Sequence, residues 1–224
     1  MKTGTKILGI GMTQANVPKT MDGRKTNTRR IEACLRGLAG VPSMVAKRET
    51  CRNGELVFTI QEGIKFHIVK PRHQIGDRLY VKEALQRSSE EPPYWATYKT
   101  DSKVVLDGYD EKRQWESDDA NEWKNKVIPA RYMPRSAART FIEITDVRCE
   151  RIQEITESDA KAEGANRPYG RSPDAYDKYG TPEGIGFSYK LGFQKLWNDT
   201  NGKDAWERND WVFAYTFKLV EAPQ

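Results

Sequence analysis

The chain has 224 residues, of which 37% are hydrophobic and 31% charged, and its formal net charge is +5. Six Trp, ten Tyr and seven Phe supply bulky side chains for a buried core, which excludes a disordered chain. No apolar run is long enough to cross a membrane, and the apolar patch at residues 7–12 is broken by glycine and lacks a signal-peptide cleavage site. We therefore expect a cytoplasmic protein without a membrane segment, and its positive charge favours an anionic partner such as nucleic acid.

The three cysteines and two histidines restrict the chemistry. Cys34, Cys51 and Cys149 are widely spaced, odd in number and form no Cys-x-x-Cys pair, so we expect no disulfide framework. His67 and His73 are the only imidazoles, so the sequence predicts no Cys/His zinc site and no metal. There is also almost no choice of a catalytic histidine, and we expect no cofactor.

The N-terminal part of the chain predicts a strand, a helix and a basic segment. Residues 6–12 are typical of a short strand, and residues 14–21 of a short helix that ends at the turn residue Gly23. The strongly basic residues 24–30 follow at once. Residues 33–53 mix Gly, Pro and Ser with apolar positions and indicate no single structure.

The middle of the chain predicts strands. Residues 56–60 and 64–69 are rich in β-branched and aromatic side chains and predict a hairpin, and residues 76–83 predict a strand entered through a Gly-Asp turn. Residues 86–128 are polar and acidic, which is typical of a surface insertion with one strand at 94–99. Residues 139–151 alternate apolar and polar positions more clearly than any other segment and predict a long strand.

The C-terminal third predicts two helices and a final strand. A short helix is expected over residues 156–163, because Thr156 is a good N-cap and Gly164 a helix stop. Residues 165–184 are rich in Gly and Pro and predict a loop. Residues 187–199 predict an amphipathic helix and residues 211–219 a strand.

Strands dominate this pattern and short helices lie between them. The order lacks a regular alternation of strand and helix, which argues against a doubly wound sheet. We find no internal repeat and no linker. The sequence therefore predicts an α+β fold in a single domain over residues 1–224.

Four pieces of the sequence are similar, in this order, to the ASCH family of PUA-like proteins. They are Gly-Arg-Lys-Thr-Asn-Thr-Arg-Arg at 23–30, Gly-Asp-Arg-Leu-Tyr-Val at 76–81, the strand through 144–147 that leads into the short helix ending at Gly164, and the last helix with the aromatic strand 211–217. Residues 133–139 resemble the longer members found in phages and prophages. The resemblance implies a PUA-like mixed β-barrel with short flanking helices and surface insertions near 33–70, 86–131 and 165–184.

Some ASCH proteins that are similar to this chain remove the acetyl group from 4-acetylcytidine with a Lys-x-x-Thr pair and a distant Glu. The resemblance places Lys25, Thr28 and Glu163 on these residues. It implies metal-independent amide hydrolysis: the Thr28 hydroxyl attacks, a neutral Lys25 takes its proton, and Glu163 orients Lys25 or relays a proton to the leaving amine. The cations beside Lys25 favour its neutral form. Residues three apart point to opposite faces of a strand, so Lys25 and Thr28 can cooperate only in a turn or irregular loop.

The basic segment also predicts binding of an anionic ligand. Arg24, Arg29 and Arg30 lie close together without an acid, Thr26 can donate to phosphate, and Gly23 allows close approach of the backbone. The alternatives without a function are that residues 24–30 form a solvated basic loop and that Glu163, at the helix end, is a solvated surface carboxylate.

Further candidates lie outside this segment. Glu83 is a second carboxylate that could face a substrate, or a surface residue at a strand end. Arg131, Arg135 and Arg139 recur every four residues, either as a basic face toward phosphate or as partners of the acidic insertion. We include Arg135 with Glu83 among the predicted substrate-binding residues.

Three functions stay open at this stage. The first is an amidohydrolase acting on an acylated cytidine or similar modified nucleoside. The second is a module that binds RNA without chemistry, or a ribonuclease, with Tyr80 and Trp95 as candidates to stack a base, although such aromatic side chains more often belong to a core. The third is a phage accessory protein that binds a host protein through the acidic insertion.

Overall fold

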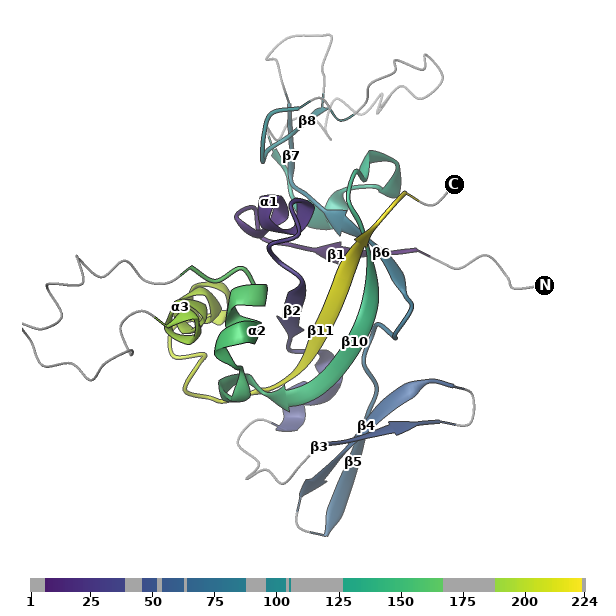
Figure 1. Ribbon diagram of the computed structural model, residues 1–224, viewed down its shortest axis with the longest axis vertical. Coiled ribbons are helices and arrows are strands. Elements are labelled where there is room, and N and C mark those ends of the chain that lie inside the picture. Colours follow the sequence, from purple (N-terminus) through teal and green to yellow (C-terminus); the bar gives the residue numbers. More distant parts are fainter. Residues whose placement is uncertain are drawn as a thin grey trace, which may run out of the picture. The chain divides into compact units, whose positions relative to one another are not determined.

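A computed structural model describes residues 7–38, 46–51, 54–62, 64–87, 96–103, 105, 127–166 and 188–222 (Figure 1). The fold is mixed α+β, with strands in the majority and few helices. No helix among these described residues is long and apolar enough to cross a membrane.

The strands are β1 (Leu8–Gly11), β2 (Asn27–Arg30), β3 (Ala46–Thr50), β4 (Leu56–Glu62), β5 (Lys65–Val69), β6 (Arg78–Lys82), β7 (Leu85–Arg87), β8 (Ala96–Tyr98), β9 (Val127–Ile128), β10 (Phe141–Arg151) and β11 (Trp211–Val220). The helices are α1 (Asn16–Met21), α2 (Glu157–Ala162) and α3 (Tyr189–Asn201). Short 3₁₀ helices are η1 (Ala33–Leu38), η4 (Ala130–Tyr132), η5 (Arg135–Ala137) and η6 (Ile152–Glu154).

The strands form one five-stranded sheet in the order β1-β6-β10-β11-β2 and two three-stranded sheets in the orders β3-β4-β5 and β8-β7-β9. β1 pairs with β6 in parallel, whereas β6 with β10 and β2 with β11 are antiparallel. The five-stranded order has two ends, β1 and β2, so a closed barrel is not seen in the part of the chain that the structure describes.

The chain divides into two compact units. One consists of Met1–Gly23, Arg78–Glu143 and Leu219–Gln224, and the other of Arg24–Asp77 and Ile144–Lys218. We call them the first and the second unit. Each is assembled from segments that are distant in the sequence, and the single domain over residues 1–224 stays a prediction.

The first unit contains β1, β6 and the β7–β8–β9 sheet. Leu79 and Val81 of β6 are fully buried, as the alternation in the sequence predicts, but the intervening Tyr80 is buried too. A small cluster beside β7 combines Leu85, Tyr98, Val105, Met133 and Ala137. The predicted insertion at 86–128 therefore contributes Tyr98 and Val105 to a core.

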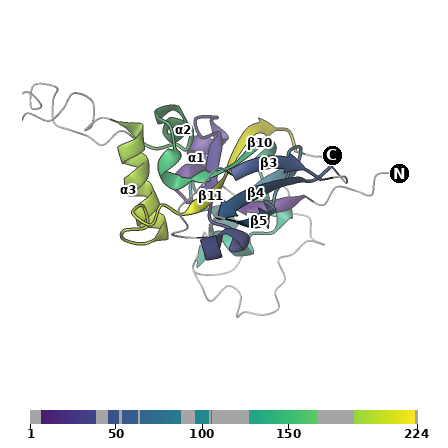
Figure 2. The ribbon, with the colours of Figure 1, turned by 90° about the horizontal axis from the view of Figure 1, so that it is seen from below.

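The second unit is built around β11, whose aromatic side chains are buried on both faces of the strand. Phe213 contacts Phe58 of β4, with ring centroids 5.7 Å apart, and this contact packs the β3–β4–β5 sheet onto β11. α2 and α3 lie side by side (Figures 1 and 2). Phe193 and Trp197 of α3 are buried in a cluster with Ile152, Ile155 and other apolar side chains.

Local signals explain the helix boundaries. The Thr156 hydroxyl accepts a hydrogen bond from the Asp159 backbone N–H at 3.1 Å, and it begins α2 as the sequence predicts. Gly164 adopts a positive φ of 78°, which suits the glycine stop after this helix. The Ser188 hydroxyl caps α3 in the same way, accepting from the Leu191 N–H at 3.0 Å.

Most predicted elements are confirmed within a few residues: the strand at β1, the helix at α1, the β4–β5 hairpin, and the elements at β6, β8, β10, α2, α3 and β11. The sequence did not indicate η1, β3, β7 or β9, nor that residues 27–30 form a strand. Most of the predicted loop at 165–184 and of the insertion at 86–131, including Trp95, lies outside the described residues.

Candidate functional site

The basic segment of the second unit is held on both sides by backbone hydrogen bonds. The Thr26 N–H donates to the carbonyl of Ala162 at 2.9 Å, and the Thr26 carbonyl accepts from the Phe217 N–H at 2.8 Å. β2 then pairs with β11, with Thr28 opposite Tyr215. This segment is therefore fixed between β11 and the end of α2, and is not a solvated loop.

Lys25 lies just before β2 and is buried, with 2% of its surface exposed. Its Nζ donates to Oε2 of Glu163 and to the Glu163 backbone carbonyl, both at 2.7 Å. The two residues are 138 positions apart in the sequence, and the resemblance assigns them to the same site. Burial lowers the pKa of Lys25, the Glu163 carboxylate partly offsets this, and the charges of Arg30 and Arg29 lower it further.

Arg29 is the centre of an ion network. Its guanidinium donates to Glu150 Oε1 through Nε at 2.9 Å and through Nη2 at 2.6 Å, to Asp159 Oδ2 at 3.0 Å, and to Glu163 Oε1 at 3.1 Å. The Arg29 side chain is fully buried. Its charge is therefore satisfied by carboxylates of the chain itself, although residues 24–30 contain no acid.

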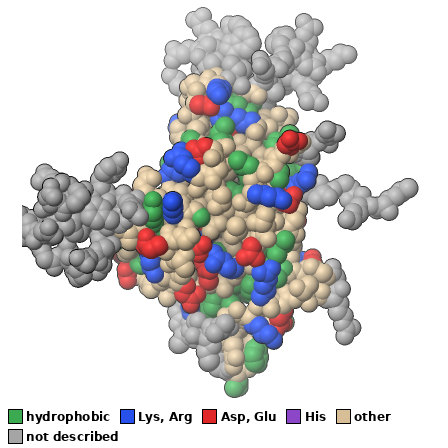
Figure 3. Space-filling model, in the orientation of Figure 1, with side chains coloured by type: hydrophobic (Ala, Val, Ile, Leu, Met, Phe, Trp, Pro, Cys, Tyr) green, Lys and Arg blue, Asp and Glu red, His purple; other side chains and the backbone are tan. Residues whose placement is uncertain are grey.

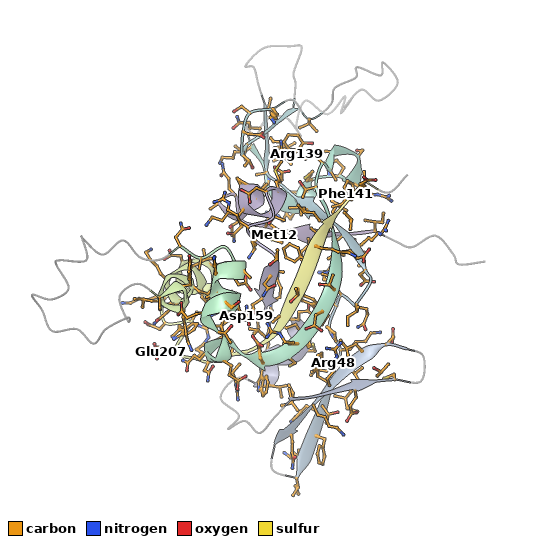
Figure 4. All side chains as sticks on the ribbon, in the orientation of Figure 1. Met12, Arg48, Arg139, Phe141, Asp159 and Glu207 are labelled. Atoms are coloured by element: carbon orange, nitrogen blue, oxygen red, sulfur yellow. The ribbon has the colours of Figure 1, made fainter. Side chains whose placement is uncertain are left out.

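Asp159 belongs to the first turn of α2 (Figure 4) and ties that helix to two strands. It accepts from Arg29 of β2, from Asn27 Nδ2 at 3.2 Å and from Arg148 Nη2 of β10 at 2.8 Å. Burial alone would raise the pKa of Asp159, but the Arg148 hydrogen bond and the charge of Arg29 outweigh it, and the pKa lies below its usual range. Figure 3 shows acidic and basic side chains intermixed over α2 and the neighbouring strands.

Thr28 lies inside β2, whereas Lys25 precedes it. Asn27 and Arg29 both reach Asp159, so by the alternation of a strand Thr28 belongs to the other face. In the part of the chain that the structure describes, no hydrogen bond joins the Thr28 hydroxyl to Lys25 or Glu163. Residues 25–26 precede β2 and Thr28 lies within it, and the role of Thr28 stays a prediction.

The Thr28 face of β2 borders a second buried polar group. The Tyr215 hydroxyl donates to Glu32 Oε1 at 2.5 Å, and burial together with Glu32 raises the pKa of Tyr215 above its usual range. His73 packs edge-on against Tyr215 with ring centroids 5.6 Å apart, and burial lowers the pKa of His73 to about 4. Burial also lowers the pKa of Arg30, which is half-buried.

The buried Glu83 and the half-buried Arg139 form a separate ion pair in the first unit. Arg139 donates to Glu83 through Nε at 2.9 Å and Nη2 at 2.6 Å, and to Asp101 through Nη1 at 2.8 Å. The Arg139 guanidinium also stacks over the ring of Tyr98, 3.7 Å from its centroid. Glu83 therefore has a structural partner, and Arg139 pairs with the acidic insertion, one of the two alternatives that the sequence left open.

The remaining predicted residues have different surroundings. Arg24 and Arg135 are exposed, and Thr26 is half-buried. Tyr80 is buried beside Lys82, as expected for a core aromatic. Among the described residues, no group of three or more His, Cys, Asp and Glu side chains is arranged to hold a metal ion.

Sequence reasoning missed Arg148, Glu150 and Asp159 as members of the network. Arg148 and Glu150 occupy polar positions of β10, and Asp159 lies in the acidic first turn of α2. No local signal distinguishes these residues from solvated ones, because their partners come from distant segments. Comparisons with protein-family models, with curated proteins and with solved structures find no match for this chain.

Proposed function

We propose that this chain is a PUA-like protein of ASCH type that hydrolyses, in the cytoplasm and without a metal or cofactor, the amide of an N-acylated cytidine or a similar modified nucleoside. Lys25 and Glu163 form the proton-transfer pair, and Thr28 supplies the nucleophile. The proposal rests on one observation, the direct contact of Lys25 with Glu163 across 138 positions of sequence.

The burial of this pair supports a chemical role. A lysine is a base only when its amine is neutral, and burial lowers the pKa of Lys25 toward that state. Oε2 of Glu163 lies 2.7 Å from Lys25 Nζ, within the distance that proton transfer requires. Arg29 holds the other oxygen of Glu163, so the carboxylate keeps Oε2 toward Lys25.

The proposed reaction has two stages. The Thr28 hydroxyl adds to the acyl carbon while Lys25 takes its proton; the amide C–N bond then breaks, and the proton returns to the leaving cytidine amine. This leaves the acyl group as an ester on Thr28. Water adds to the ester with Lys25 again as base, and the acid and the free hydroxyl are released. This step requires the Thr28 hydroxyl to come within hydrogen-bond distance of Lys25 Nζ.

The test is turnover of 4-acetylcytidine to cytidine and acetate, followed by chromatography. Lys25→Met, Glu163→Gln and Thr28→Val should each lower kcat by about 10²-fold or more, because each removes a proton-transfer group or the nucleophile. Thr28→Ser keeps a hydroxyl and should retain most activity. Lys203→Met changes an exposed lysine and is the matched control for Lys25→Met.

Two further readouts separate catalysis from folding. Circular dichroism and thermal unfolding identify any variant that fails to fold, and comparison of Thr28→Val with Thr28→Ser isolates the hydroxyl. For the wild type, kcat/KM should rise with pH and level off below the ordinary lysine pKa of about 10.4. Absence of turnover by the folded wild type, or turnover unaffected by all three substitutions, would reject this function.

A second candidate, binding of single-stranded RNA without chemistry, is favoured by an exposed aromatic side chain. Tyr132 is 64% exposed, and the Arg131 guanidinium lies 4.8 Å from its ring centroid. Such a pair suits stacking on a base, and the exposed Arg135 follows on η5. Tyr132→Ala should weaken binding of a labelled oligonucleotide, and Arg135→Ala should make its salt dependence shallower. Binding unchanged in both variants would exclude this surface.

A further inference from the structure

The outer strand of the β3–β4–β5 sheet carries an exposed apolar strip. Ile64, Phe66 and Ile68 are 94%, 62% and 73% exposed. They occupy alternate positions in and next to β5, so they share one face of the sheet. Large apolar side chains gathered in this way on a surface usually mark an interaction site.

The backbone edge of β5 has a matching property. In the described part of the chain β5 pairs with β4 alone, so its second edge carries no strand. The opposite edge of the same sheet, β3, is protected by charge: Lys47, Arg48 and Glu49 are exposed, and Arg48 pairs with Asp146 at 2.7 Å. The charged side chains of β3 therefore disfavour pairing with another strand at that edge, whereas the β5 edge carries the apolar strip.

We propose that β5 pairs antiparallel with β5 of a second copy of this chain, about a two-fold axis beside Phe66. The sequence Ile-Lys-Phe-His-Ile at 64–68 is symmetric in its apolar positions. Only this register sets Ile64 opposite Ile68 of the second copy and Phe66 opposite Phe66, so that every apolar side chain meets another. A shift by one residue places the two strips on opposite faces, and a shift by two leaves one apolar side chain of each copy unmatched.

The expected dimer is closed and weak. It is closed because the outer edges of the six-stranded sheet are the two charged β3 strands, which do not template further addition. It is weak because stable interfaces bury about 800 Å² on each partner, and one short strand with three apolar side chains supplies less. On the other face, the register sets Lys65 opposite His67, which adds no attraction. The inference is independent of the proposed activity.

Sedimentation velocity of the full chain over two orders of magnitude in concentration tests the dimer. The wild type should pass from monomer to dimer, with no larger species. Phe66→Glu sets two carboxylates opposite each other at the axis and should abolish the dimer, whereas Lys65→Gln on the other face should not. A wild type that stays monomeric at every concentration, or a dimer that survives Phe66→Glu, would overturn the proposal and leave the strip to a different occupant.

A disulfide cross-link tests the register. In a background with the exposed Cys34 and Cys51 changed to Ser, oxidation should link Phe66→Cys to its copy, because facing residues at the axis have the Cα separation that a disulfide needs. Ile64→Cys faces Ile68 in this register and should link far less. Equal linking of both variants would refute the axis at Phe66. Because all these side chains are exposed, thermal unfolding should be unchanged in each variant.

Discussion

Arg29→Met removes the cation that three carboxylates share in the second unit. The wild-type guanidinium is fully buried and donates four hydrogen bonds, to Glu150, Asp159 and Glu163. Methionine keeps a similar length and an apolar stem but donates nothing. The substitution therefore leaves acidic groups in a region with little water, and the folded state loses stability.

The remaining cations limit the loss in the free energy of unfolding that Arg29→Met causes. Asp159 keeps Arg148 at 2.8 Å, and Glu163 keeps Lys25 at 2.7 Å, so neither carboxylate is left without a partner. Breaking a buried pair costs about 3–5 kcal/mol, and the retained partners favour the lower end of that range. A loss of about 3 kcal/mol lowers the midpoint of thermal unfolding by roughly 6–12 °C in a chain of this size.

Denaturant and thermal unfolding measure this loss, with Arg148→Met as the matched control. The Arg148 side chain is 38% exposed, so its removal should cost less than about 1 kcal/mol. A loss for Arg29→Met no larger than that for Arg148→Met would refute the view that the buried guanidinium organises the network.

The same variant predicts a dependence on pH. The wild-type environment lowers the pKa of Asp159, so its stabilising effect is present above about pH 4 and is lost as the pH falls through the lowered value. Arg29→Met removes one cause of that shift. The difference in stability between wild type and variant should therefore shrink as the pH falls below about 4.

Three other substitutions should lower stability, each for a different reason. Arg139→Met leaves the buried Glu83 carboxylate without its cation and should cost about 3–5 kcal/mol in thermal unfolding. Gly192→Ala would place a Cβ where the backbone oxygen of Asn166 lies, and should cost about 1–3 kcal/mol because α3 must shift. Burial and a hydrogen bond to a carboxylate raise the pKa of Tyr215, so the folded state keeps a proton that the unfolded chain loses, and wild-type stability should fall above about pH 10. Tyr215→Phe should lower the free energy of unfolding at neutral pH and remove its share of that alkaline fall.

Each of these expectations has a control in the same part of the fold or of the same residue type. Arg135→Met changes an exposed arginine, and Gly11→Ala places a Cβ where no atom lies within 4 Å. Tyr132→Phe changes an exposed tyrosine. If a control loses as much stability as its matched variant, or if the alkaline fall is identical in Tyr215→Phe, the corresponding contact does not have the energy assigned to it.

Long periodic segments could be predicted from the sequence, and short ones could not. β10 and β11 combine length with alternation, so local pattern and burial agree. β2 has four residues and three cations or amides, a composition that indicates a loop. It is a strand because β11 pairs with it and α2 closes its start, and neither partner is near it in the sequence. β7 and β9 are also too short for a local sequence pattern to indicate a strand.

The candidate site shows the same division. The resemblance joined Lys25 with Glu163, and their contact has the geometry of an ion pair. The sequence could not assign Arg29 to carboxylates rather than to a ligand, because a charge alone does not say which opposite charge it meets. In the sequence, Glu150 and Asp159 cannot be distinguished from solvated residues, because only the tertiary structure brings β10 and α2 into contact with Arg29 of β2.

The sequence by itself determined the α+β composition and the principal strands and helices. These depend on periodicity and local chemistry, which act within a few turns or strands of chain. The tertiary structure decided which charges are buried, that Lys25 has a lowered pKa, and that Glu83 pairs with Arg139. Burial and charge pairing depend on segments that are more than fifty residues apart, and only folding brings such segments together.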